Sequence, residues 1–278
     1  MKKNKNIIIL VFFLPILWLS SCDNTSSEVD YNPNVSASKD YIRAEDAIME
    51  IANSFFKGLN DSLVINYGYG YIDACDVSLH PSTNSINFGY GSMDRLCQDN
   101  KFRKGLFCAT FTGPLFLDWT VADIETDSLF VDDFLIEASI QIQNLGINEN
   151  NLPEYAIKVI SSNIMLPDTA KMNGVKLTTD FLLIWAEGSL TPPIHEDDLY
   201  LITGSSSGFS SDGIEFSTEI QDSLYNYVDC FWISRGINLI TVPSAAIQTG
   251  DIDYLTDDGC FNEFYFYFNS NLFYDYIK

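Results

Sequence analysis

The sequence predicts an all-β fold of antiparallel sheets, either a sandwich or a curved half-barrel, with one N-terminal α-helix. Three observations support this. One early stretch has helical periodicity, several later stretches alternate between apolar and polar residues, and tight-turn dipeptides separate them. A period of two puts apolar side chains on one strand face and polar ones on the other, as in antiparallel sheets with one solvated face. No strands alternate regularly with helices, which argues against an α/β fold.

The predicted helix spans Tyr41 to Leu59. Its apolar residues recur at steps of three and four and so form one stripe. They are Ala44, Ile48, Ile51, Phe55 and Leu59. Ser38 or Asp40 is expected to cap its start, and Gly58 and Asn60 to mark its end.

The clearest strands are predicted at 134–142 and 214–220. In the second, Glu215, Ser217 and Glu219 should point outward. Three dipeptides supply the positive φ angles that tight hairpin turns need. They are Asn173-Gly174, Asp212-Gly213 and Asp258-Gly259.

Residues 1–21 have the pattern of a secretory signal peptide, with lysines before an apolar run from Ile7 to Leu19. A membrane-spanning helix needs about 20 apolar residues, so this run is too short. Its end, Leu19-Ser-Ser-Cys22, resembles a bacterial lipobox, in which the cysteine thiol is acylated and the peptide is cut before it. We therefore expect Cys22 to carry a lipid anchor in the outer membrane, facing the periplasm or the surface. The alternative is an ordinary secretory signal with an uninvolved cysteine.

Residues 22–39 are polar and are predicted to form a flexible tether. A single β-rich domain should follow at 40–278, and a weak repeat of strands and cysteines within it suggests two related halves. The formal charge is −23, or about −26 once the lysines of the leader are removed. Such a surface repels phosphate backbones, so nucleic-acid binding is not expected.

Cysteine usage fits an exported protein. Apart from Cys22 an odd number remains, and we predict the disulfides Cys75–Cys97 and Cys230–Cys260, because each closes a loop of similar size. Each would stabilise the fold by about 3 kcal/mol. Cys108 is then left as a small buried residue. There is no C-x-x-C motif and the only histidines are His80 and His195, so neither a metal nor a cofactor is expected.

Two patterns resemble catalytic motifs. Gly204-Ser-Ser-Ser-Gly208 matches G-x-S-x-G, but no histidine follows Ser206, and we interpret the segment as a hairpin loop. Adjacent acids could supply the two carboxyls of a glycoside hydrolase, although solvated turns are the simpler interpretation. These acids are Asp132-Asp133, Glu196-Asp197-Asp198 and Asp257-Asp258. A loose calcium site around Asp94, Asp99 and Asn100 is a further alternative. His195 is expected to be an exposed loop residue.

Tyrosines form two alternating sets. Tyr67, Tyr69 and Tyr71 are separated by single residues, and Tyr265 and Tyr267 share one strand face opposite phenylalanines. Most such stripes belong to a core, with the hydroxyls reaching its rim. On an exposed sheet the rings could instead contact a sugar or a protein, and these five are the candidate ligand-facing residues.

Four segments carry a resemblance to a family of uncharacterised lipoproteins from Bacteroidota. They are Ala44-Glu-Asp-Ala47, the run from Asp99 to Gly113, Asp197 to Gly204, and Cys230 to Gly236. The resemblance implies an envelope location and supports the β-rich fold, and it implies no activity. We therefore expect a lipid-anchored, non-enzymatic binding or structural module with a glycan or an envelope protein as partner. The alternative is a carboxylate-dependent glycan hydrolase whose site forms only in the fold.

Overall fold

The structure is a computed structural model that describes residues 32–114, 117–165, 173–191, 194–230, 232–255, 260 and 263–276. Asn32–Lys278 forms one compact unit. The predicted leader, Cys22 and the first part of the predicted tether lie outside the described residues. Among those described, no helix is long and apolar enough to span a membrane.

In the described part of this unit, one antiparallel sheet contains 14 strands, which follow one another in sequence order. The predicted all-β fold with an N-terminal helix is confirmed, as one continuous sheet and not as a two-sheet sandwich. The strands are β1 Tyr69–Ile72, β2 Cys75–His80, β3 Ser85–Leu96, β4 Phe102–Phe111, β5 Val121–Val131, β6 Phe134–Ile147, β7 Pro153–Met165, β8 Lys176–Glu187, β9 Leu199–Phe209, β10 Glu215–Tyr227, β11 Arg235–Thr241, β12 Thr249–Asp253, β13 Glu263–Phe268 and β14 Asn271–Tyr276.

Helix α1 spans Pro33–Asn60 and therefore begins earlier than predicted. The Asn32 side chain caps it by accepting the N–H of Asn34 at 3.0 Å, and Pro33 occupies the first turn, where a missing N–H costs nothing. The prediction that the flexible tether extends to residue 39 was therefore wrong for residues 33–39, which are helical. Ala37 and Ser38 are fully buried there, because small side chains let the helix approach the sheet closely.

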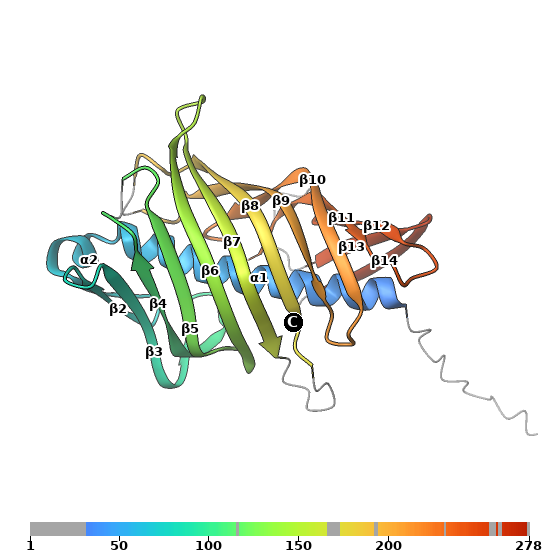
Figure 1. The fold of residues 1–278 in the computed structure, drawn as a ribbon, viewed down its shortest axis with the longest axis horizontal. Helices are drawn as coiled ribbons and strands as arrows, with labels where there is room; N and C mark the ends of the chain where they lie inside the picture. Colours follow the sequence, from blue (N-terminus) through green and yellow to red (C-terminus); the bar gives the residue numbers. More distant parts are fainter. Residues whose placement is uncertain are drawn as a thin grey trace, which may run out of the picture. The chain divides into compact units, whose positions relative to one another are not determined.

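The sheet curls around α1, which runs across the strands (Figure 1). Beyond the predicted apolar stripe, Ile42, Met49 and Phe56 are also buried, so the helix is covered on more than one side. Its aromatic contacts extend from β3 to β10, and they include Phe55–Phe88, Phe56–Tyr200 and Tyr41–Phe216. Burying a helix on several sides requires a curved sheet, which explains the architecture.

A second helix, α2, spans Ser62–Tyr67 and was not predicted. The Asp61 side chain accepts the N–H groups of Leu63 and Val64 at 2.8 and 2.9 Å, and Gly68 ends the helix in the left-handed region. A single short turn of helix leaves no periodicity in a sequence, so only these caps could have indicated it.

The strand predictions hold. In β10, Glu215, Ser217 and Glu219 are exposed while Phe216 and Thr218 are buried. Gly213 has a φ of 76° in the β9–β10 hairpin. The tight turn predicted at Asn173-Gly174 was wrong, because Gly174 does not have a positive φ and the dipeptide is only the last part of a longer β7–β8 hairpin, next to an Ile164–Val175 bridge. The tip of that hairpin and Asp258-Gly259 lie outside the described residues.

Candidate functional site

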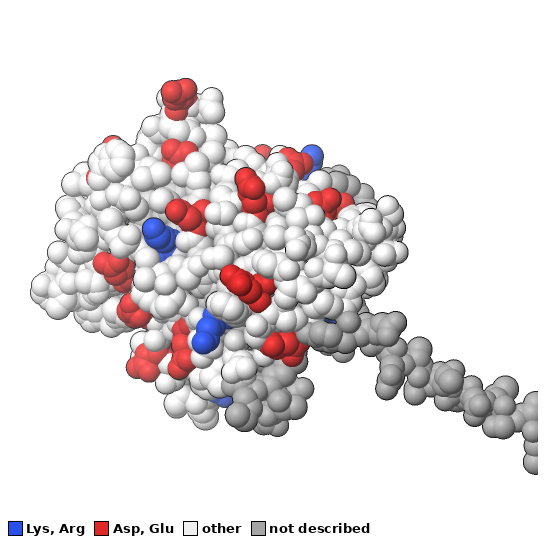
Figure 2. Space-filling view, turned by 45° about the vertical axis from the view of Figure 1, so that its right-hand side comes forward, with Lys and Arg blue, Asp and Glu red and all other residues white. Residues whose placement is uncertain are grey.

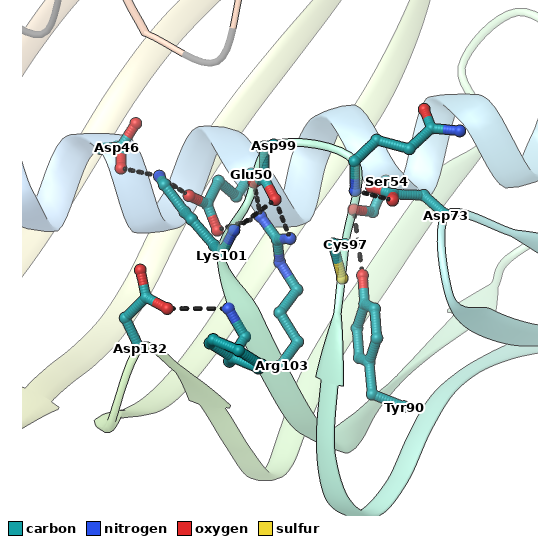
Figure 3. Close-up of polar contacts among 12 residues, drawn as sticks. Asp46, Glu50, Ser54, Asp73, Tyr90, Cys97, Asp99, Lys101, Arg103 and Asp132 are labelled. Carbon is teal, nitrogen blue, oxygen red and sulfur yellow. Dashed lines mark hydrogen bonds and ion pairs between the residues drawn. The ribbon is translucent and has the colours of Figure 1, made fainter.

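A cleft lies between the middle of α1 and the start of β4. We call it the Trp232 cleft, after the residue on the β10–β11 loop that borders it. Two hollows meet there, of about 410 and 520 Å³ including open solvent, and both are lined by Asp46, Glu50 and Trp232. Figure 3 shows the charged side chains of the cleft converging from α1 and from the β3–β4 connection.

The β3–β4 turn directs two basic side chains inward. Asn100 adopts a φ of 64°, the Asp99 carboxylate accepts the N–H of Lys101 at 3.0 Å, and the N–H of Cys97 bonds the carbonyl of Lys101 at 3.0 Å. Arg103 then follows on the buried face of β4. Lys101 and Arg103 therefore both face the helix, because they are two residues apart along an extended chain.

The helix supplies the matching acids. Asp46 and Glu50 are four residues apart and so lie one turn from each other on the same face. Lys101 Nζ donates to Asp46 Oδ2 at 2.9 Å and also to Glu50, and Arg103 donates to Glu50 Oε2 at 2.9 Å. Arg103 also binds both oxygens of Asp99. These five side chains are at most 17% exposed, so this is a buried ion-pair network.

Burial and charge pull the two helix carboxyls in opposite directions. Burial raises the pKa of Asp46 to about 7, against the attraction of Lys101 and with added repulsion from Glu50. Burial also acts to raise the pKa of Glu50, but the charges of Arg103 and Lys101 outweigh it and the pKa is lowered. Of the two helix carboxyls, Glu50 is thus ionised and Asp46 titrates near neutrality.

A perturbed carboxyl pair in a cleft invites comparison with a hydrolase. Glycoside cleavage needs two carboxyls roughly 5–9 Å apart with the sugar between them. Here the Lys101 ammonium bonds both Asp46 and Glu50 and so occupies that space. The pair has the pKa separation of an acid and a base but not the open gap.

Trp232 is held in place by a disulfide. Cys230 and Cys260 are bonded, with their Cα atoms 5.2 Å apart, which confirms that predicted pairing. The Lys101 ammonium lies 4.1 Å from the centre of the Trp232 ring, a cation–π contact. The bridge therefore anchors the loop that closes one side of the cleft.

The predicted Cys75–Cys97 disulfide was wrong, since both thiols are free and buried. Each sulfur contacts a backbone carbonyl instead, of Asp76 and Arg95 respectively. Burial raises the pKa of Cys75 to about 12, which leaves it unreactive as a thiol. Cys108 is also free, and it is half-buried on the outer face of β4, not in the core as predicted.

The five candidate tyrosines lie at opposite ends of the sheet. Tyr67 ends α2, and Tyr69 and Tyr71 lie on the first strand, each more than 60% exposed. Tyr265 and Tyr267 lie on β13, the penultimate strand. The two sets are separated by the length of the molecule's sheet (Figure 1) and so do not form one platform.

The second set belongs to a larger cluster, here called the tyrosine patch, made of Tyr265, Tyr267, Leu272 and Tyr274. The ring centre of Tyr265 is 6.3 Å from that of Tyr267 and 5.4 Å from that of Tyr274. Tyr267, Leu272 and Tyr274 are 40%, 56% and 51% exposed. On the neighbouring strand β12, Asp251 is the cross-strand partner of Tyr267, and Asp253 is the partner of Tyr265. An apolar, exposed surface thus borders a pair of carboxylates.

Ser206 is not placed as a nucleophile. The segment predicted as a hairpin loop is the middle of β9, where Ser206 pairs with Thr179 and Thr218 on its two neighbours and is 6% exposed. Gly204 has a φ of 127°, and a Cβ there would lie 2.2 Å from the carbonyl oxygen of Asp180. Gly204 therefore permits a close approach of β8, and Ser206 alone of the three serines lies on the buried face of β9, since Ser205 and Ser207 are exposed.

The acidic pairs also have structural roles. Asp132 and Asp133 form the β5–β6 turn with φ angles of 45° and 69°. Asp198 is buried and accepts the indole N–H of Trp185 at 2.9 Å. His195 lies 3.3 Å from the same carboxylate and is half-buried, not exposed as predicted. Asp257-Asp258 lies outside the described residues.

The two carboxylates suggested as calcium ligands form ion pairs with basic side chains. Asp94 pairs with Lys104 at 3.0 Å and Asp99 with Arg103, so the two carboxylates are directed to different cations. Within the described ranges no group of three metal-binding side chains occurs.

Sequence reasoning missed the Trp232 cleft, although a signal was present. Asp46 and Glu50 recur with the helical period inside an otherwise apolar helix, and Lys101 and Arg103 recur with the strand period. Charged residues that recur with the same spacing as the buried apolar residues of their helix or strand are candidates for burial. Comparisons with protein-family models, curated proteins and solved structures found no match.

Proposed function

We propose that the protein is a lipid-anchored envelope lipoprotein that binds a glycan through the tyrosine patch. The carrying observation is the contact between the Tyr265 ring and the rings of Tyr267 and Tyr274 on an exposed sheet face. Rings in mutual contact hold one another in place, so little side-chain entropy is lost when a ligand packs on them.

The chemistry of the patch suits a sugar. The C–H face of a pyranose packs on an aromatic ring as apolar surface, and its hydroxyls require hydrogen-bond acceptors. Asp251 and Asp253 lie on the strand next to the rings and provide such acceptors. A nucleic-acid partner is disfavoured, because acidic side chains are spread over the surface and outnumber basic ones on the face drawn in Figure 2.

The lipid anchor at Cys22 rests on the lipobox resemblance of Leu19-Ser-Ser-Cys22. Because α1 starts at Pro33, the segment between Cys22 and the folded body is shorter than the predicted tether. Such an anchor would keep the domain close to the membrane.

A glycan hydrolase is the second candidate, supported by the perturbed pKa values of Asp46 and Glu50. It is disfavoured by Lys101, which bridges the two carboxylates. Release of reducing sugar from a polysaccharide by the mature protein, abolished in Asp46→Asn, would favour the hydrolase over the binding module.

The binding function is tested by titrating the soluble domain against a panel of neutral polysaccharides in a calorimeter. Tyr265→Ala and Tyr274→Ala should each weaken binding about tenfold, because each ring contributes roughly 1–1.5 kcal/mol. Tyr71→Ala is the matched control at the other end of the sheet, where no loss is expected. Unchanged affinity in both patch variants would refute the role of the patch.

A further inference from the structure

We propose that the glycan bound at the tyrosine patch is an extended chain without acidic groups, which also occupies a hollow on the outer face of β7–β11. The inference rests on the proposed glycan function and deepens it, because it adds a second part to that site and names the class of sugar. We call this part the hydroxyl hollow, because its floor carries the hydroxyls of Thr178, Ser205, Ser207 and Ser217.

Differences in side-chain length form the hollow. The four hydroxyl residues of the floor are short, and all of them are exposed on the outer face of β8, β9 and β10. The longer apolar side chains of Ile160 and Leu239 border the floor on β7 and β11. The volume of the hollow is about 730 Å³, which lies within the range of small-molecule sites.

Cross-strand pairing connects the hollow with the tyrosine patch. Residues that are direct partners lie on the same face of a sheet. One continuous row of such partners consists of Asp180, Ser205, Glu219, Leu239, Asp251 and Tyr267. Strands β8 to β13 lie side by side (Figure 1) with about 4.8 Å between neighbours, so the row extends roughly 24 Å along the sheet. A ligand that contacts both ends of this row must contain several sugar units.

The hollow offers hydrogen-bonding groups of both kinds, as the hydroxyls of a sugar require. Serine and threonine hydroxyls donate and accept, whereas carboxylates accept only. Thr178 Oγ1 and Ser207 Oγ lie 3.1 Å apart and share one hydrogen bond. Within the described ranges, Asp180 and Glu219 form no ion pair, so their carboxylate oxygens are available to a ligand.

Charge along the row excludes an acidic sugar polymer. Asp180, Glu219 and Asp251 lie on the path between the hollow and the patch. The base that lines the hollow, Lys158, is the partner of Asp180 at the end far from the patch. A uronic acid or a sulfated sugar would therefore meet like charges along most of the path, whereas a neutral chain would not.

Chain length is the first test. Linear oligosaccharides of two and six units, of the cellulose, xylan and mannan types, are titrated against the soluble domain in a calorimeter. In at least one series the six-unit chain should bind at least tenfold more tightly than the two-unit chain, and also more tightly than a hexamer of galacturonic acid. Equal affinity for two and six units in every series that binds, or tightest binding of the galacturonic acid hexamer, would overturn the inference. If no glycan binds, the proposed function falls together with it.

Variants separate the hollow from the patch. Ser217→Arg places a long side chain on the floor and should reduce the affinity for the six-unit chain at least fivefold, with two-unit binding unchanged. Ser207→Arg serves if that variant does not fold, and Thr110→Arg on the exposed face of β4 is the matched control that should bind like the parent. Tyr265→Ala should weaken the binding of both chain lengths. Six-unit affinity that is unchanged in a folded floor variant would reject the hollow and leave the patch as the glycan site.

Discussion

Lys101 and Trp232 meet at a distance of 4.1 Å between the ammonium nitrogen and the ring centre, although they come from opposite halves of the chain. Lys101 stands before β4, and Trp232 on a loop held by the Cys230–Cys260 disulfide. The curled sheet brings both against α1. This contact joins the buried ion-pair network to the loop that carries Trp232. Among the described residues, that loop is the only part of the cleft wall with a disulfide.

Replacement of Lys101 should strongly destabilise the fold. Lys101→Met leaves Asp46 and Glu50 buried without their shared cation, and breaking a buried pair costs about 3–5 kcal/mol. Urea denaturation measures the loss. Lys104→Met is the matched control, because its pair with Asp94 is exposed and should contribute less than about 1 kcal/mol. Similar losses in both variants would contradict the buried network.

Stability should depend on pH through Glu45. Burial raises its pKa to about 7, against hydrogen bonds from Tyr254 and Tyr41, whereas its ordinary value is 4.5. The folded state holds this proton more tightly than the unfolded state. Protonated Glu45 therefore contributes to the free energy of unfolding in full below pH 4.5, and this contribution is lost as the pH rises to 7.

The test compares the free energy of unfolding of the parent and of Glu45→Gln across that pH range. The parent should lose roughly 3 kcal/mol more than the variant between the two limits. Asp46 also titrates in this range, but it does so in both proteins, so its effect on the free energy of unfolding cancels in the comparison. Parallel pH profiles would show that Glu45 does not titrate in this window.

The thiol count follows from the cysteine placement. Titration of the unfolded, unreduced mature protein should find the three thiols of Cys75, Cys97 and Cys108. A single reactive thiol would mean that Cys75 and Cys97 are bonded in the native protein, as the sequence predicted. Reduction should release the remaining pair, Cys230 and Cys260.

The disulfide should stabilise the loop that carries Trp232. Its cysteines are 30 residues apart, so closing this loop contributes about 3.5 kcal/mol by restricting the unfolded chain. The double variant Cys230→Ser/Cys260→Ser should unfold at correspondingly lower urea concentration. A double variant of unchanged midpoint would show that the bridge adds no stability.

The anchor is tested in the cell. Cys22→Ala should abolish acylation and release the protein from the membrane fraction, because lipid attachment needs the thiol. Ser21→Ala, one residue earlier, is the control and should remain acylated. Retention of lipid and membrane association in Cys22→Ala would refute the anchor.

The sequence by itself determined the periodic elements. Alternation in β6 and β10 and the apolar stripe of α1 are local patterns, and each follows from which face of one element is buried. The Cys230–Cys260 bridge was also predictable, because it closes a local loop. The same argument failed for Cys75–Cys97, since loop length does not determine where side chains point.

Only the tertiary structure decided which charges meet. Asp46 and Glu50 on α1 face Lys101 and Arg103 because the sheet curls around the helix, and curvature is a property of all strands together. The tertiary structure likewise showed that the two tyrosine sets are far apart, because they lie near opposite ends of the sheet. Local periodicity reports burial, whereas contacts between distant segments depend on the summed twist and packing of the whole sheet.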